Sequence, residues 1–314
     1  MKNLLFRSDN NIDVGGKIRH LFNIKTDEEK LKEAIEKKYN ECLNEKYNEN
    51  DNSEELKRII SDLDTYIYNN YRASVYYEDI KTEFTYKYNE NIDYYGASLI
   101  KIVEAMYLLD GAKDGSIDLN EKLKYESKYK ADFSKGMKKR KVGEKISIRN
   151  LIEYAIKYSD NTAHFMLSDY IGISNLREYE KKLGASEITI TNGDSFGNQN
   201  AVDMNLYLHH AYEIINSNTE YGEFLKKIML NNDTNALNLT DDIKIAHKYG
   251  QYDSYYHDVG IAFYDNPYYI SVLTSHGNGK YLEVVNNISS KVNELHNNFY
   301  KLRKERCYNE YYGK

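Results

Sequence analysis

Ser98 and Lys101 stand three residues apart at the start of the longest strongly apolar run of an otherwise polar chain. Residues 94–109 read YYGASLIKIVEAMYLL, and the run after Ala97 is apolar on nearly every helical face. On a helix, positions three apart lie on one face, about one turn from each other. A helix that is apolar all round is buried, so a hydroxyl and an amine share the edge of the core. A serine with an adjacent base can attack an amide or lactam carbonyl.

Lys101 can serve as that base only in its neutral form. An unperturbed lysine has a pKa of about 10.4, so burial and a neighbouring cation must lower it. The apolar residues around Lys101 supply the burial, and Lys248 is the candidate cation. The ordinary alternative, a surface lysine at a helix edge, is disfavoured by the apolar residues on both sides.

Two further polar triplets follow along the chain. Ser159-Asp160-Asn161 lies at an expected junction between two helices, and Lys248-Tyr249-Gly250 ends an expected strand. Taken alone, the first triplet is better explained as a helix cap and turn, because all three residue types favour caps. Asp160 in particular is expected to fix the junction through hydrogen bonds to the backbone.

The order of these groups resembles a known set of motifs. S-x-x-K, then S-D-N, then K-T-G is the motif set of class A β-lactamases and penicillin-binding proteins. The resemblance runs from about residue 74 to residue 296. Two stretches, His257-Asp258-Val259-Gly260 and residues 269–274, resemble the late strands of the less-studied serine hydrolases of this superfamily. The chain therefore resembles these hydrolases more than it resembles true class A enzymes. It implies an enzyme that forms an acyl-enzyme on β-lactams or on D-Ala-D-Ala-like peptide amides.

The resemblance also implies a role for each group. Ser98 is the nucleophile, Ser159 relays a proton to the leaving nitrogen, and Lys248 attracts the substrate carboxylate. Asn161 binds the acyl side chain or orients Lys101. The expected catalytic residues are therefore Ser98, Lys101, Ser159 and Lys248, and the expected substrate-binding residues are Asn161, Tyr249, Gly250 and Gln251.

Two of the substrate-binding positions act through the backbone in this scheme. The N–H groups of Ser98 and Gln251 are expected to form the oxyanion hole. Gly250 is expected to let a substrate backbone lie along the strand edge, since no side chain blocks it.

The chain departs from the family pattern at two places. Tyr249 stands where the family has Thr or Ser, whose small hydroxyl contacts the substrate carboxylate. The loop glutamate that activates water in class A enzymes is also missing, because residues 187–203 contain no Glu-x-x-x-Asn pattern. Glu187 and Asp203 fit a strand and a helix start, so Asp194, beside Gly193, is the remaining candidate for a water activator and a poor replacement for the glutamate. We therefore expect acylation with slow deacylation.

A non-catalytic descendant that binds ligands or serves as a structural module is the alternative function. Tyr249 and the missing glutamate favour it, whereas the intact polar residues of the three motifs favour the enzyme, because buried polar groups without a purpose cost stability. Ser127 and Lys130 show that S-x-x-K alone carries little information. That copy lacks small residues before it and an apolar helix after it, so we expect it to be solvent-exposed.

Composition excludes several other classes of protein. The formal net charge of −6 does not suggest a nucleic-acid or anionic-membrane partner, so the expected partner is the small-molecule or peptide substrate. No apolar run reaches the length of a membrane-spanning helix, about 18 residues. Residues 1–22 contain no apolar core of signal-peptide length, which indicates a cytoplasmic chain if it is full length. The resemblance implies the cell envelope or the outside of the cell instead.

Neither a metal nor a cofactor is expected. The eight histidines are scattered, without an H-x-x-x-H pattern on a helix, and the chain has no Gly-rich phosphate loop. His247 and His257 are expected to serve strand packing. Cys42 and Cys307 leave either two free thiols, which we expect, or one disulfide.

The elements that must position the site follow a simple order. Residues 26–45 and 53–70 predict two helices, with a capping box at Thr26. Two strands are expected within residues 73–88 and three within 243–274, with a mostly helical block between them. This order predicts an α+β fold, a five-stranded antiparallel sheet flanked by helices with an inserted helical subdomain. The expected domains are an arm and extra helix (1–52), a catalytic domain (53–305, with sheet parts 53–95 and 243–305 and a helical part of about 110–242) and a tail (306–314).

Overall fold

The computed structural model describes residues 25–186, 195–240, 243–275 and 281–313. They divide into two compact units, one from the described part of Met1–Glu45 with Leu302–Lys314, the other Lys46–Lys301. The domain boundaries that we expect after residues 52 and 305 stay predictions, because a compact unit is not necessarily a domain that folds on its own. The expected N-terminal arm and the loop with Glu187 and Asp194 fall almost wholly outside the described residues.

The larger unit is built around a five-stranded antiparallel sheet in the order β2-β1-β9-β8-β7. Early and late strands meet in its middle, where Val75 of β1 lies opposite Val272 of β9. This arrangement confirms the predicted sheet and its inserted helical block. The strands are β1 (Ala73–Asp79), β2 (Thr85–Tyr88), β7 (Lys244–Tyr252), β8 (Tyr255–Phe263) and β9 (Tyr268–Ser275).

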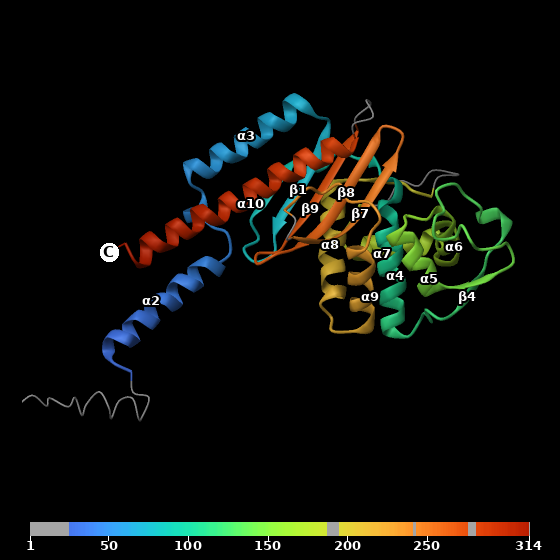
Figure 1. Cartoon of the computed structure of the whole chain (residues 1–314), viewed down its shortest axis with the longest axis horizontal. Helices are drawn as coiled ribbons and strands as arrows, with labels where there is room; N and C mark the ends of the chain where they lie inside the picture. The colour runs from blue at the N-terminus through green and yellow to red at the C-terminus, as the bar shows by residue number, and fades with distance from the viewer. Residues whose placement is uncertain (1–24, 187–194, 241–242, 276–280, 314) are drawn as a thin grey trace, which may run out of the picture. The chain divides into compact units, whose positions relative to one another are not determined.

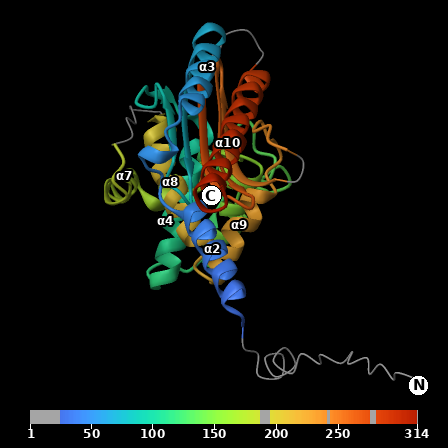
Figure 2. The same cartoon turned by 90° about the vertical axis from the view of Figure 1, so that its left-hand side faces the viewer.

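Helices cover both faces of the sheet (Figures 1 and 2). One face carries α3 (Glu54–Asn70) and α10 (Tyr281–Tyr311), and the Tyr77 hydroxyl on β1 hydrogen-bonds His296 Nδ1 of α10 at 2.7 Å. The other face carries α8 (Ala201–Ile215), whose His209 ring centre lies 4.3 Å from that of Tyr269. Because both faces are covered, every residue of β1 is buried instead of every second one.

The inserted block surrounds one central helix, α4 (Ile100–Asp114). Its apolar residues are buried on nearly every side, as the sequence predicts. The start of the helix α5 (Ile148–Lys157) also agrees with the sequence. The Ser147 hydroxyl caps this helix by accepting the Asn150 N–H at 3.3 Å. The remaining elements of the block are η2 (Ala97–Leu99), η3 (Ser127–Tyr129), α5 (Ile148–Lys157), α6 (Asn161–Ile171), α7 (Ile173–Lys182), α9 (Glu220–Leu230) and the short pairs β3 (Tyr94–Tyr95) with β6 (Asn198–Gln199) and β4 (Lys122–Lys124) with β5 (Lys145–Ser147).

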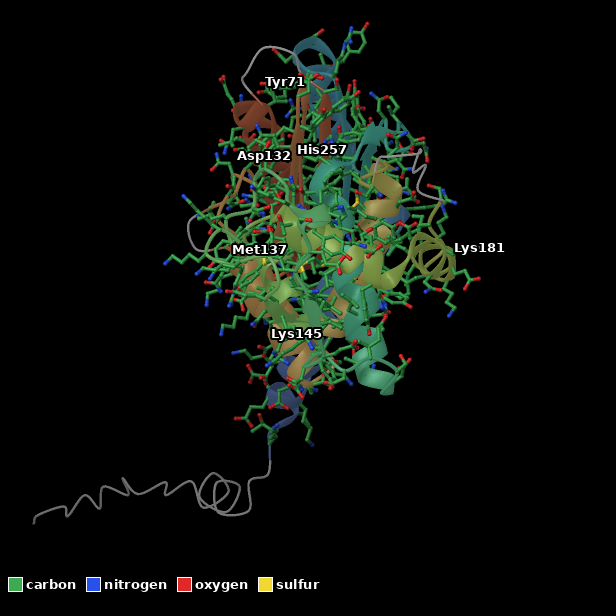
Figure 3. The ribbon with its side chains drawn as sticks, turned by 90° about the vertical axis from the view of Figure 1, so that its right-hand side faces the viewer. Tyr71, Asp132, Met137, Lys145, Lys181 and His257 are labelled. Atoms are coloured by element: carbon green, nitrogen blue, oxygen red, sulfur yellow. A yellow bond between two sulfur atoms is a disulfide. The ribbon has the colours of Figure 1, made fainter. Side chains whose placement is uncertain are left out.

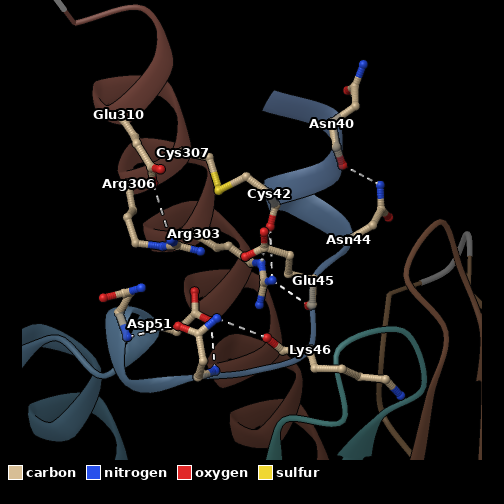
Figure 4. Close-up of a disulfide and its surroundings, with 12 residues drawn as sticks. Asn40, Cys42, Asn44, Glu45, Lys46, Asp51, Arg303, Arg306, Cys307 and Glu310 are labelled. Carbon is tan, nitrogen blue, oxygen red and sulfur yellow. Dashed lines mark hydrogen bonds and ion pairs between the residues drawn. A yellow bond between two sulfur atoms is a disulfide. The ribbon is translucent and has the colours of Figure 1, made fainter. Parts of the chain in front are cut away.

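The smaller unit joins the two ends of the chain through a disulfide. Cys42 of α2 (Asp27–Asn44) is bonded to Cys307 of α10, so the expectation of two free thiols is wrong (Figure 4). The two cysteines are 265 residues apart in sequence, yet their Cα atoms lie 5.9 Å from each other. Nearby, the Arg303 guanidinium donates to the backbone carbonyls of Cys42 and Glu45. The Thr26 capping box at the start of α2 is confirmed.

Removing this disulfide should loosen the smaller unit. For the double variant Cys42→Ala/Cys307→Ala we expect a loss of about 2–4 kcal/mol in the stability of α2, because the bond no longer restricts its unfolded states. Amide hydrogen exchange along α2 measures this loss. A reductant should reproduce the effect in the original protein and add nothing in the variant. Equal protection in both proteins would contradict the prediction.

In the parts of the chain that the structure describes, we find no helix with both the length and the apolar character needed to cross a membrane.

Candidate active site

Ser98 and Lys101 open the central helix, one turn apart. The helix was expected to begin at about Ser98, and the structure begins with the 3₁₀ turn η2, followed by α4 from Ile100. Ser98 is 8% exposed, whereas Lys101 is fully buried. Lys101 Nζ lies 2.8 Å from Ser98 Oγ, so the expected contact between hydroxyl and amine is present. Ala97, just before the serine, has a φ of 46°, a strained backbone conformation of the kind that gathers at functional sites.

The surroundings of the Lys101 amine define where its lone pair points. Nζ donates to the Ser159 carbonyl oxygen at 2.7 Å and to Asn161 Oδ1 at 2.8 Å. Both atoms can only accept, so they occupy two N–H bonds of a neutral amine. The third direction, toward Ser98 Oγ, is then left to the lone pair. Such an amine is oriented to accept the serine proton.

Two neighbouring contacts hold these acceptors in place. Asp160 caps α6 by accepting the N–H of Ala163 at 2.9 Å and also accepts that of Met137 at 2.8 Å. Asn161 Nδ2 donates to the Asp132 carbonyl oxygen at 3.1 Å, which turns Oδ1 toward the lysine. Figure 3 labels Asp132 and Met137 in this part of the molecule. Asp160 therefore has the expected structural role at the junction.

Lys248 reaches the same group of residues from β7. Its Nζ donates to Ser159 Oγ at 2.9 Å, while Ser159 Oγ lies 3.4 Å from Lys101 Nζ. Burial lowers the pKa of Lys248 well below its ordinary value, and the nearby Lys101 lowers it further. Ser159 thus stands between two buried amines, where its hydroxyl can pass a proton.

Burial lowers the pKa of Lys101 to about 7, which brings the neutral amine within reach of physiological pH. The carboxylates of Glu104 and Asp160 oppose this shift and keep the pKa from falling further. We expected burial and a neighbouring cation together to lower the pKa of Lys101, and burial is the dominant cause of its low pKa.

Glu104 and His164 form a buried pair that the sequence argument did not single out. His164 Nδ1 lies 2.9 Å from Glu104 Oε2, and both side chains are fully buried. Glu104 follows Lys101 by three residues on α4, so it shares the same helix face. The available signal was a single carboxylate inside an apolar helix, one turn beyond the candidate base.

We expect Glu104→Gln to move the pH dependence of Ser98 acylation. The carboxylate raises the pKa of Lys101, so its loss should lower that pKa and shift the acidic limb of the rate profile below about pH 7. Measuring acylation rates from pH 5 to pH 9 tests this (a range of about two units on each side of the pKa). An unchanged limb, or one at higher pH, would contradict the role given to Glu104. Glu153→Gln is the matched control, because Glu153 lies on α5 and is not among the charges that act on Lys101.

The serine opens into a cleft of about 700 Å³. Ser98 and Gln251 both line it, as an oxyanion hole from their N–H groups requires. Ser159, Asn161 and Tyr249 line it too, so five expected site residues meet there. In addition, the lining holds a set of aromatic side chains: Tyr95, Phe133, Tyr158, Phe196 and Tyr252.

Packing explains why residue 250 is a glycine, and this requirement was not visible in the sequence. A Cβ at this position would lie 2.7 Å from the Gly96 carbonyl oxygen, so only glycine allows β7 to approach the turn before Ser98. Its role along a substrate backbone stays a prediction. The same turn is tied to the sheet by His257, whose Nε2 donates to the Tyr95 carbonyl oxygen at 2.8 Å while Nδ1 accepts the Thr274 N–H at 3.1 Å. Burial lowers the pKa of His257 to about 4.

His247 also packs within the sheet, with Nδ1 2.8 Å from Asp258 Oδ1. Asp203 lies in the first turn of α8, as expected, and binds the N–H of Ser186 at 3.1 Å. The second S-x-x-K copy is solvent-exposed at both Ser127 and Lys130, in agreement with the prediction. Among the described residues, no cluster of His, Cys, Asp and Glu could hold a metal ion.

The fold defines a class, the superfamily of class A β-lactamases and penicillin-binding proteins. The chain belongs to the beta-lactamase enzyme family, whose profile matches residues 53–296. Family membership supports a serine hydrolase of lactam or amide bonds, and the recognised superfamily is confirmed. No protein among the curated ones matches this chain.

Solved structures with the same fold include both penicillin-binding proteins and β-lactamases. A PBP-A variant, solved as an acyl-enzyme complex with penicillin G, is 18% identical with a TM-score of 0.70, covering 77% of this chain and 97% of its own. A class A beta-lactamase from Bacteroides cellulosilyticus is 22% identical with a TM-score of 0.67, over 77% and 98%. The TLA-3 extended-spectrum beta-lactamase is 20% identical with a TM-score of 0.68, over 76% and 98%. At these identities the likeness shows the fold.

Proposed function

We propose that this protein is a serine hydrolase that forms an acyl-enzyme at Ser98 on β-lactams or on D-Ala-D-Ala-like peptide amides. The observation that carries the proposal is the set of contacts around Lys101 Nζ, which binds two fixed acceptors and faces Ser98 Oγ at 2.8 Å. With a pKa of about 7, this amine is a suitable base near neutral pH.

Acylation would proceed as a balanced proton transfer. Lys101 takes the Ser98 proton as the Oγ–C bond forms, and the N–H groups of Ser98 and Gln251 stabilise the resulting oxyanion. When the C–N bond breaks, the Ser159 hydroxyl gives its proton to the leaving nitrogen. Ser159 then regains a proton from Lys101 or Lys248, whose amines lie 3.4 Å and 2.9 Å from its oxygen.

We further propose that deacylation is slow. The supporting observation is the absence of the family's Glu-x-x-x-Asn pattern from residues 187–203. In the described lining of the cleft, the carboxylates are Asp233, which is paired with Lys135, and Asp253. Asp194, the remaining candidate for a water activator, lies outside the described residues. Without a positioned base, water attacks the ester slowly.

The non-catalytic alternative is not favoured, because the chain keeps the amine, both serines and the asparagine in mutual contact at the site. A buried lysine without a function would lower the stability of the fold and contribute nothing to activity.

Intact-protein mass spectrometry with benzylpenicillin tests both parts of the proposal. We expect an adduct of one penicillin per chain, mapped to Ser98 by peptide analysis, that persists long after free penicillin is removed. Absence of any adduct with penicillin and with an acyl phosphonate would overturn the acyl-enzyme. Rapid steady-state turnover of a chromogenic cephalosporin that depends on Ser98 would overturn slow deacylation alone.

A further inference from the structure

The third motif of this chain differs from the family pattern in its sequence, and the contacts of Lys248 and Tyr249 show what that difference does. Lys248, the residue expected to attract a substrate carboxylate, is fully buried and is not among the residues that line the cleft. Tyr249 lines the cleft instead. The surface that a substrate meets at this motif is therefore a phenol ring.

Lys248 Nζ has no direction left for a substrate anion. One of its N–H bonds reaches Ser159 Oγ at 2.9 Å and another reaches the carbonyl oxygen of Tyr249 at 2.6 Å. The ring of Tyr249 covers the remaining side, with its centre 4.3 Å from Nζ. The ring of Tyr256 stacks against the ring of Tyr249, with 6.2 Å between the ring centres and 16° between the ring planes, and this contact supports the orientation of Tyr249.

The phenol also occupies the space next to the proton relay. The side chains of Ser159 and Thr234 interact with the Tyr249 hydroxyl, so the oxygen lies beside the relay serine. In the family pattern this neighbourhood belongs to a small Thr or Ser and the substrate carboxylate. A tyrosine there removes the room for the anion as well as access to its cation.

The charges that remain in the described cleft lining do not replace the lost cation. Lys135 is paired with Asp233, and Asp253 adds a second carboxylate. One cation against two carboxylates repels an incoming anion. The aromatic lining, by contrast, suits flat or apolar groups.

We propose that the cleft selects acyl donors with an uncharged, apolar or aromatic group at the place where the family's substrates carry a carboxylate. This inference rests on the proposed acyl-enzyme at Ser98 and specifies its substrate class as neutral lactams, esters and amides. Tyr249 is the specificity-determining residue, because it both covers Lys248 and supplies the apolar surface.

Benzylpenicillin and its methyl ester form a matched pair of probes that differ only at the carboxylate, which the ester carries as a neutral methyl ester. After correction for their reactivity with hydroxide, we expect the ester to acylate the protein at least ten-fold faster than the acid. Tyr249→Thr should uncover Lys248 and remove the apolar surface, so the rate with the acid should rise at least ten-fold and the rate with the ester should fall. Tyr249→Phe keeps the ring and should keep the preference for the ester.

The outcomes separate this inference from the acyl-enzyme itself. Faster acylation by the acid than by the ester in the unaltered protein overturns the inference and leaves the acyl-enzyme standing. An unchanged ratio in a folded Tyr249→Thr variant overturns the role of Tyr249. No labelling of Ser98 by either penicillin or by an uncharged acyl phosphonate overturns the proposed function, and the inference with it.

Discussion

Ser98→Ala is expected to abolish covalent labelling by benzylpenicillin. The variant lacks the cleft-lining hydroxyl that lies 2.8 Å from the Lys101 amine, so no acyl bond can form at this position. The acylation rate should fall by about 10³-fold or more, as for removal of a nucleophile elsewhere. Intact-protein mass spectrometry over a time course measures the loss.

The chain supplies its own control for this experiment. Ser127 has the same S-x-x-K spacing but is exposed, so Ser127→Ala should acylate at the original rate. Melting temperatures of both variants show whether each is folded. An adduct of undiminished rate in a folded Ser98→Ala protein would place the nucleophile elsewhere and end the proposal.

Lys101→Met is the change with the second largest expected effect. It removes the base while keeping a side chain of similar length in the buried space, and the acylation rate should fall by about 10²–10⁴-fold. The direction in which the acylation rate changes with pH identifies the base. Below its pKa of about 7 the amine is charged and cannot accept a proton, so the rate of the unaltered protein should rise through pH 7 and level off above it.

This limb of the profile should be missing from Lys101→Met. Lys130→Met, in the exposed copy of the motif, should keep both the rate and the limb. A rate that does not change between acidic and basic pH in the unaltered protein would exclude Lys101 as the base, and so would a Lys101→Met variant that acylates normally.

Much of the fold could be read from local patterns. Residues 73–79 and 268–274 contain aromatic and β-branched residues, which are typical of strands, and the structure places them side by side in the sheet. The apolar pattern of α4 predicted its burial, because a helix that is apolar all round has no face for water. The contact between Ser98 and Lys101 follows from helical spacing alone.

Other features depend on distances that no local pattern contains. The expectation of free thiols failed because Cys42 and Cys307 are 265 residues apart, and only the folded chain brings their Cα atoms to 5.9 Å. Glu104 was hidden among apolar neighbours, since its partner His164 comes from another helix. The packing role of Gly250 arises from the approach of β7 to Gly96.

The sequence by itself determined which chemical groups are available: a serine one turn from a lysine, and two further motifs in a recognisable order. It could do so because residue types and helical spacing are local properties. The tertiary structure alone decided what that chemistry faces. It directs the lone pair of Lys101 toward Ser98 by fixing two acceptors from the junction between α5 and α6 and the start of α6. It also brings Lys248 Nζ to Ser159 Oγ, 89 residues away in sequence, with the ring of Tyr249 over the same amine. The contact with Ser159 depends on how β7 packs against the helical block and therefore cannot be read along the chain.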